Sequence, residues 1–157
     1  MQSRMCALIA VVGALLTASM AAAHDKPVEF GVQASVGDND LDVGIGARVI
    51  TDFDALGDHF NFIGTFDYFF PGGGLTYWEL NGNAVYVFTP RHSSLRPYLG
   101  GGLNLGYASG PGGSASKLGL NVVGGINFRG QSLKPFVETK VVVRNGGHFV
   151  VSAGFRF

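Results

Sequence analysis

The sequence predicts an all-β fold, an eight-stranded antiparallel up-and-down transmembrane β-barrel. Residues 24–157 contain eight stretches in which apolar side chains alternate with polar or small ones, the period of two that is typical of a β-strand. Clusters of Gly, Pro, Asn, Asp and Ser separate the stretches and favour turns. Aromatic residues gather near both ends of the stretches, as in the two aromatic belts of a membrane barrel.

The first four strands carry mostly Phe, Val, Leu and Tyr on one face. In the first of them, Phe30 and Val32 alternate with Glu29 and Gln33. The segments GDND and PGGG predict tight turns, and TDFDALGDH predicts a longer polar connection. We expect these strands at residues 28–36, 41–49, 60–70 and 77–88.

The last four strands follow the same rule, with more glycine on the polar face. The polar segment TPRHSSLRP precedes them, and SGPGGSAS predicts a flexible loop between the fifth and the sixth. The segments RGQSLKP and NGG predict the remaining turns. We expect these strands at residues 98–108, 118–128, 136–144 and 148–157.

The alternation by itself also fits a soluble barrel with an apolar interior, such as a lipocalin-like periplasmic binder. Charged residues within the strands, however, fall on the face that is rich in Gly and Asn, which suits a narrow interior. The strand lengths match the 9–11 or so residues that a tilted strand needs to cross a bilayer. We therefore expect the apolar face to contact lipid and the sheet to close, because lipid offers no hydrogen bonds to a free edge.

Charge is distributed unevenly along the chain. From His24 to Glu79 there are ten acidic and two basic residues, whereas beyond Glu79 there are one acidic and eight basic residues. Closing the sheet brings the acidic early strands opposite the basic late strands, and pairing offsets the cost of burying their charges. We predict a lumenal ion-pair network of Glu29, Asp42, Arg48, Asp67, Glu79, Arg129, Glu138, Lys140, Arg144 and Arg156.

The first residues have the pattern of a secretory signal. Arg4 precedes an apolar run that is too short for a bilayer span, and Ala21 and Ala23 satisfy the small-x-small rule for cleavage before His24. We therefore expect a signal peptide at 1–23 and a barrel domain at 24–157. Cleavage removes Cys6, the only cysteine, so the mature chain could form no disulfide.

With these features the chain resembles the small eight-stranded outer-membrane barrels of Gram-negative bacteria, of the OmpA transmembrane-domain and OmpX type. The resemblance covers residues 24–157 and includes the segments RPYLGGGLNLGY, KPFVETKVVV and FVVSAGFRF. It implies a monomer in the outer membrane with both termini in the periplasm, in contact with outer-membrane lipids. The predicted external loops are shorter than is usual in that family. The resemblance also implies an assembly signal, read by the outer-membrane assembly machinery, at Phe149, Val151, Phe155 and Phe157.

No catalytic, cofactor or metal site is predicted. A lipid hydrolase would need a Ser, a His and a carboxylate; His148 has only Ser109, Ser114 and Ser116 on a nearby loop and no acid in NGGH, so we expect a surface histidine. The four histidines lack metal-ligand spacing. We expect a structural, envelope-integrity barrel that is not an enzyme and binds no nucleic acid. A narrow pore or a transport barrel for a small hydrophobic or ionic ligand is the alternative, because inward glycines could leave a passage.

Overall fold

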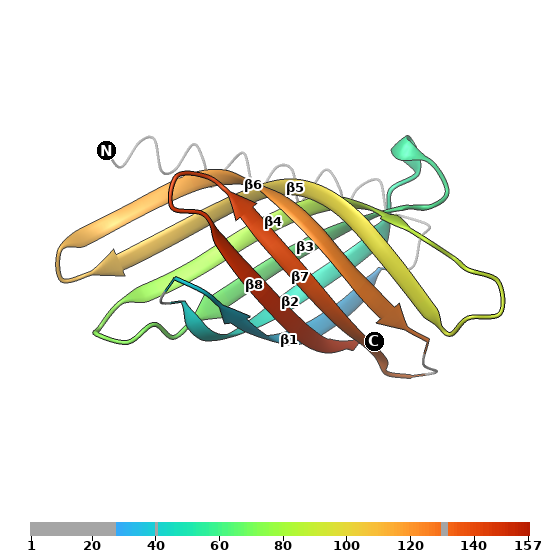
Figure 1. The fold of residues 1–157 in the computed structure, drawn as a ribbon, viewed down its shortest axis with the longest axis horizontal. Coiled ribbons are helices and arrows are strands. Elements are labelled where there is room, and N and C mark those ends of the chain that lie inside the picture. The colour runs from blue at the N-terminus through green and yellow to red at the C-terminus, as the bar shows by residue number, and fades with distance from the viewer. Residues whose placement is uncertain (1–27, 40, 130–131) are drawn as a thin grey trace.

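The computed structural model describes residues 28–39, 41–129 and 132–157. Eight strands form one closed barrel in which each strand pairs antiparallel with its neighbours in the chain, and β1 pairs with β8 (Figure 1). The strands are β1 Glu29–Gly37, β2 Asp42–Asp52, β3 Phe60–Phe69, β4 Thr76–Val87, β5 Leu95–Gly110, β6 Gly113–Phe128, β7 Lys134–Val143 and β8 His148–Arg156. The predicted fold class is confirmed.

The alternating pattern places the apolar side chains outside. Large hydrophobic residues are exposed on every strand except β4, among them Val32 at 54% and Leu120 at 58%, whereas Glu79 and Asn104 are fully buried. This arrangement is the inverse of a lipocalin-like barrel, so the soluble alternative does not describe the fold. No helix in the described part of the chain has the length and hydropathy needed to cross a bilayer.

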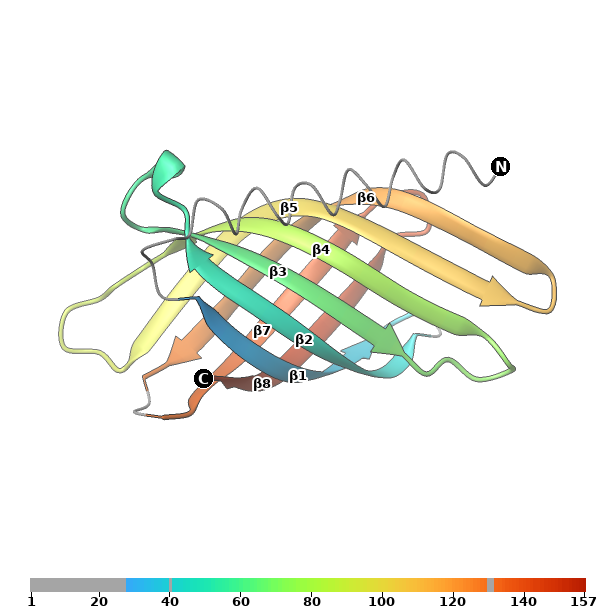
Figure 2. The same ribbon diagram turned by 180° about the vertical axis from the view of Figure 1, so that it is seen from behind.

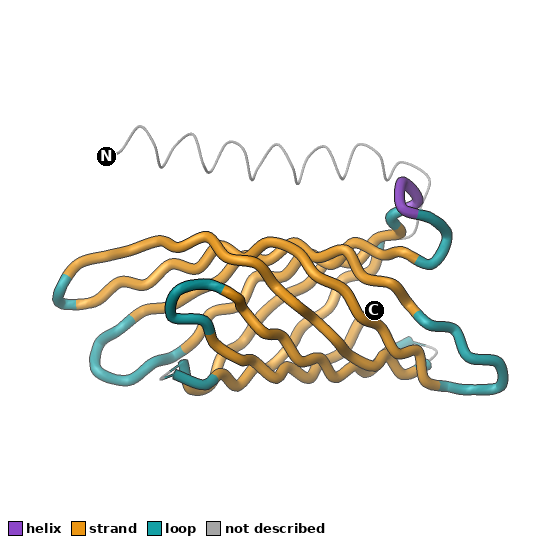
Figure 3. Tube along the Cα trace, turned by 45° about the horizontal axis from the view of Figure 1, so that its top comes forward, coloured by secondary structure: helices purple, strands orange, loops and turns teal. Residues whose placement is uncertain are grey.

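The two ends of the barrel differ in shape. The termini end, where β1 begins and β8 stops, carries the β2–β3 connection with a short 3-10 helix, η1 Asp54–Leu56 (Figure 2). The opposite end, called here the hairpin end, is dominated by β5 and β6, which project beyond the other turns (Figure 3).

The structure corrects the prediction for residues 109–116. SGPGGSAS is not a flexible loop: β5 runs to Gly110 and β6 starts at Gly113, so that only two residues form the turn. Ser109 pairs with Ser114, and Gly110 pairs with Gly113. Small residues lack strong strand propensity, but the β5–β6 register established in the barrel wall continues through them.

Two apolar clusters occupy the lumen, one near each end. The termini-end cluster consists of Ile50, Ile63, Val85, Tyr98 and Val123. The hairpin-end cluster consists of Leu41, Phe69, Tyr77 and Val150. Polar residues fill the space between the clusters, so the interior is packed with side chains, as expected for eight strands.

Candidate functional site: a closed polar lumen

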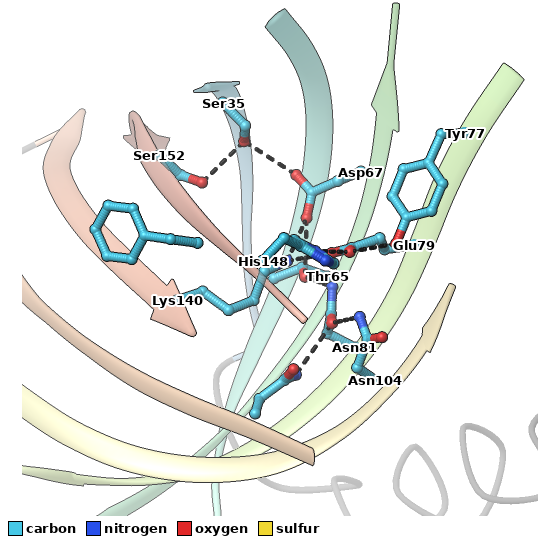
Figure 4. A network of polar contacts seen from close by, with 12 residues as sticks. Ser35, Thr65, Asp67, Tyr77, Glu79, Asn81, Asn104, Lys140, His148 and Ser152 are labelled. Atoms are coloured by element: carbon cyan, nitrogen blue, oxygen red, sulfur yellow. Dashed lines mark hydrogen bonds and ion pairs between the residues drawn. The ribbon is translucent and has the colours of Figure 1, made fainter. Parts of the chain in front are cut away.

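Glu79 is the centre of a buried charge cluster that lies next to Tyr77 of the hairpin-end cluster (Figure 4). Its Oε2 accepts a hydrogen bond of 2.6 Å from Lys140 Nζ, and its Oε1 accepts one of 2.8 Å from Tyr77 Oη. His148 Nε2 also contacts Oε1. Lys140 Nζ lies 3.5 Å from Oδ2 of Asp67, so a single ammonium group joins two carboxylates.

Asp67 connects this cluster to β1. Its Oδ1 accepts hydrogen bonds from Gln33 Nε2 at 2.5 Å and from Ser35 Oγ at 3.2 Å. Ser35 Oγ lies 2.8 Å from Ser152 Oγ on β8, across the seam where the barrel closes. The first and the last strand are therefore linked inside the lumen as well as through their backbones.

Four asparagines form an uncharged layer in the middle of the lumen. Asn81 Oδ1 accepts from Asn104 Nδ2 at 2.7 Å and from Asn121 Nδ2 at 3.0 Å. Asn121 Nδ2 also lies 3.1 Å from Asn83 Oδ1. Amides can both donate and accept, so these side chains link neighbouring strands without a net charge. Asn121 Oδ1 is buried and makes no hydrogen bond within the described chain.

Arg48 contacts several buried groups in the part of the lumen nearer the termini end. It donates from Nη2 to Glu138 Oε1 at 2.9 Å and from Nε to Gln33 Oε1 at 2.8 Å. Tyr98 Oη donates to Glu138 Oε2 at 2.6 Å. The Arg48 guanidinium also lies 3.7 Å from the centroid of the Phe136 ring. This group is held by a carboxylate, an amide and an aromatic face at once.

Inward glycines let these long side chains meet. At three of these glycines the side chains on the two flanking strands bond over the glycine: Gln33 and Asp67 over Gly46, Tyr98 and Glu138 over Gly125, and Asn83 and Asn121 over Gly102. A Cβ at Gly102 would lie 1.9 Å from the Gly82 carbonyl oxygen. These glycines therefore provide room that neighbouring side chains fill.

Seven of the ten predicted network residues take part in ion pairs. They are Glu29, Arg48, Asp67, Glu79, Glu138, Lys140 and Arg156. Within the network, Arg156 Nη1 donates to Glu29 Oε2 at 2.8 Å, whereas Glu79 pairs with Lys140.

The other three predicted residues lie outside the ion pairs of the described part of the chain. Asp42 is exposed at the start of β2, next to the β1–β2 turn, and has a positive φ of 54°. Arg129 lies exposed just beyond β6. Arg144 donates to Tyr77 Oη at 2.6 Å and to Asn104 Oδ1 at 2.9 Å, so its partners are neutral.

Sequence reasoning missed several members of the site. Lys134 pairs with Glu29, and Tyr77, Tyr98 and Gln33 link the charged groups. The expectation that His148 is a surface residue is wrong, because it is 7% exposed and contacts Glu79. Because His148 lies two residues before the inward-facing Val150, the alternation places it on the inward face as well. The sequence does not indicate its acidic partner, because Glu79 lies on a distant strand.

Among the described residues, the candidate serines do not lie beside His148 as a hydrolase would require. Ser114 and Ser116 are exposed on the projecting hairpin, whereas His148 lies inside the barrel. No group of three or more His, Cys, Asp or Glu side chains in the described ranges is close enough to hold a metal ion.

The predicted assembly residues are the exposed side chains of the last strand. Phe149, Val151, Phe155 and Phe157 are between 39% and 60% exposed on the outer surface. The predicted cleavage residues Ala21, Ala23 and His24 lie outside the described residues.

Comparison with known proteins relates this geometry to membrane barrels. No protein-family model and no curated protein sequence matches the chain. Among solved structures, the chain is similar to Neisserial surface protein A, with a TM-score of 0.60 and 19% identity over 82% of this chain and 94% of that one. It is similar to the N-terminal β-barrel domain of Pseudomonas aeruginosa OprF, with a TM-score of 0.64 and 15% identity over 85% and 100%.

A third similar structure is the outer membrane enzyme PagL, with a TM-score of 0.51 and 14% identity over 82% of this chain and 98% of that one. At these identities the likeness concerns the fold alone. Because one of these similar structures is an enzyme, the fold alone does not decide whether a protein is catalytic. The chain has the fold of the small eight-stranded outer-membrane barrels, the OmpA- and OmpX-like group.

Proposed function

We propose that the chain is a non-enzymatic outer-membrane β-barrel with a closed lumen and a structural role in envelope integrity. The filled interior is the observation that carries the proposal. Apolar clusters occupy both ends of the lumen, and buried ion pairs and asparagines occupy its centre. A conducting path would have to break several buried ion pairs at once, which is unfavourable in a low-dielectric interior.

The outer surface supports a membrane location. At the hairpin end, Trp78 stacks on Tyr107 with ring centroids 5.3 Å apart. At the termini end, Tyr86 packs against Phe60 at 5.3 Å and Phe88 at 4.9 Å. These two aromatic zones flank an exposed aliphatic band, the arrangement that places a barrel in a bilayer.

Membrane fractionation, heat-modifiable gel mobility and planar-bilayer recording test this proposal together. We expect the protein in the outer-membrane fraction, with a folded form that migrates differently from the boiled form, and no steady conductance. Steady single channels would favour the narrow-pore alternative. Recovery of the mature chain in solution without detergent would contradict the membrane proposal itself.

The projecting hairpin favours a second candidate, contact with an extended segment of an extracellular protein. Strand β6 pairs with β5 as far as Gly113, but its pairing with β7 stops at Leu120. Residues 113–119 therefore present one backbone edge that has no strand partner in the described chain. Such an edge can add a strand from another protein.

Adding charge to this edge tests the second candidate function. Ser114→Asp with Ser116→Asp should reduce the retention of barrel-containing vesicles on films of extracellular-matrix protein, because added carboxylates oppose edge pairing. The matched control is Ser93→Asp with Ser94→Asp at the opposite end of the barrel. Equal retention of both variants and the parent would contradict the candidate.

A further inference from the structure

Gly31 separates two side chains that cannot bond to each other. It is the register partner of Arg48 on β2 and of Arg156 on β8. The Cγ atoms of these arginines lie 3.0 and 3.3 Å from the position that a Cβ of residue 31 would take. Across Gly46, in contrast, the partners are complementary, because Gln33 donates to Asp67. At Gly31 both are cations.

Each of these arginines has a buried N–H group without an acceptor. Arg48 is 3% exposed and Arg156 is 8% exposed. Within the described chain, Arg48 Nη1 and Arg156 Nε make no hydrogen bond, although other nitrogens of the same side chains bind Glu138 and Glu29. A buried donor without an acceptor is unfavourable, and a neighbouring cation adds repulsion.

Further basic residues continue from Arg156 around the termini end. Lys134 is the register partner of Arg156. Arg129 follows directly after the end of β6 at Phe128. Arg96 on β5 pairs with Asn127. Neighbouring strands lie about 4.8 Å apart, so these side chains occupy one sector of the rim.

Glu29 is the acidic residue that pairs with the basic residues of this sector. Glu29 contacts Lys134 Nζ with Oε1 and accepts from Arg156 with Oε2. Arg96 and Arg129 form no ion pair with any described residue and are exposed. This sector of the rim, next to the two arginines that flank Gly31, thus has more basic than acidic side chains.

We propose that the termini end of the lumen binds a phosphate-class oxyanion between Arg48 and Arg156, with Lys134, Arg129 and Arg96 drawing it in. A tetrahedral oxyanion offers acceptors to both unpartnered N–H groups and neutralises the repulsion across Gly31. The termini-end apolar cluster includes Ile50, which follows Arg48 on the inward face of β2, so the site borders buried apolar side chains.

Inorganic phosphate is the probe for the first experiment. The full mature barrel in an uncharged detergent is titrated with phosphate at constant ionic strength while the arginine Nε–H signals are followed by NMR. We expect saturable shifts of the Arg48 and Arg156 signals and none of Arg144, which lies towards the other end. Shifts that do not saturate, or that sodium chloride reproduces, would overturn the proposal.

Two substitutions separate binding from folding. Arg156→Lys keeps the charge beside Glu29 but removes the Nε–H group, and Arg129→Gln removes an exposed charge that has no partner in the described chain. We expect each to weaken phosphate binding roughly fivefold to tenfold while the heat-modifiable mobility is retained. Lys117→Gln, a charge removal at the hairpin end, is the control. Equal affinity in Arg129→Gln and Lys117→Gln would overturn the site.

Short-chain phospholipids identify the source of the anion. If phosphatidylglycerol competes with phosphate and phosphatidylcholine does not, an anionic lipid headgroup occupies the site. If neither competes, the site takes a soluble phosphate ester. Equal competition by both lipids would contradict recognition of net negative charge and overturn the proposal.

Discussion

Lys140 Nζ donates a hydrogen bond of 2.6 Å to Glu79 Oε2 across the lumen, from β7 to β4. These strands are not neighbours in the barrel wall, so the pair braces the cylinder from inside. Both side chains are at most 5% exposed. The stability of such a pair depends on both charges being present.

Removing one charge of this pair should therefore destabilise the barrel more than removing both. We expect Glu79→Gln or Lys140→Met alone to lower the free energy of unfolding by about 3–5 kcal/mol, because each leaves a buried charge without its main partner. The double variant should lose less than the sum of the two. Urea unfolding followed by gel mobility measures all three, and additive losses would contradict the coupling.

A methyl group at Gly102 should disturb the asparagine layer. Its Cβ would lie 1.9 Å from the Gly82 carbonyl oxygen and 2.8 Å from Asn83 Oδ1. We expect Gly102→Ala to destabilise the barrel by about 1–3 kcal/mol, since the β4 backbone would have to move. Gly72→Ala is the control, because that position has open space around it. Equal urea midpoints for the two variants would argue against tight packing at Gly102.

Phe157 should matter more for assembly in cells than for folding in vitro. Its backbone N–H donates to Phe30 O at 2.9 Å, but its side chain is 60% exposed. We expect Phe157→Ala to refold in detergent yet to reach the outer membrane at a much lower level. Phe128→Ala changes another exposed aromatic at the termini end and should assemble normally. Comparable membrane levels of the two variants would remove the basis for an assembly signal.

The fluorescence of Trp78 reports the environment of the outer face. It is the only tryptophan of the chain, and it packs between Phe66 and Tyr107 on the outside of the barrel. In bilayers we expect blue-shifted emission that brominated acyl chains quench and aqueous iodide does not. Tyr107→Ala should weaken the stack without removing the blue shift. Strong iodide quenching would place this face in water.

The fold was predictable from the sequence because a period of two gives each strand one orientation in which its apolar side chains face outward and most of its charged side chains face inward. Phe30 and Val32 face outward and Glu29 and Gln33 inward, as the alternation requires. The partners inside the lumen were not predictable in the same way. Which carboxylate meets Lys140 depends on the stagger of the strands around the barrel, and alternation within a strand does not determine that stagger.

The glycines illustrate what a single sequence leaves open. An inward glycine is compatible with a passage or with two neighbours that meet over it. At Gly125 the register decides the matter, since it aligns Tyr98 with Glu138 on either side. The same registers explain why SGPGGSAS continues two strands although its residues individually favour a loop.

The length of β5 and β6 makes the barrel taller on one side than on the other. Each has 16 residues, against nine in β1 and β8. At about 3.3 Å per residue, the difference amounts to some 23 Å of additional strand on one flank. If both termini lie in the periplasm, as the resemblance implies, the tip of this flank projects from the outer face of the membrane. We then expect it to be the first part of the protein that an antibody, a protease or a phage would contact. An epitope inserted after Pro111 should accordingly be recognised on intact cells.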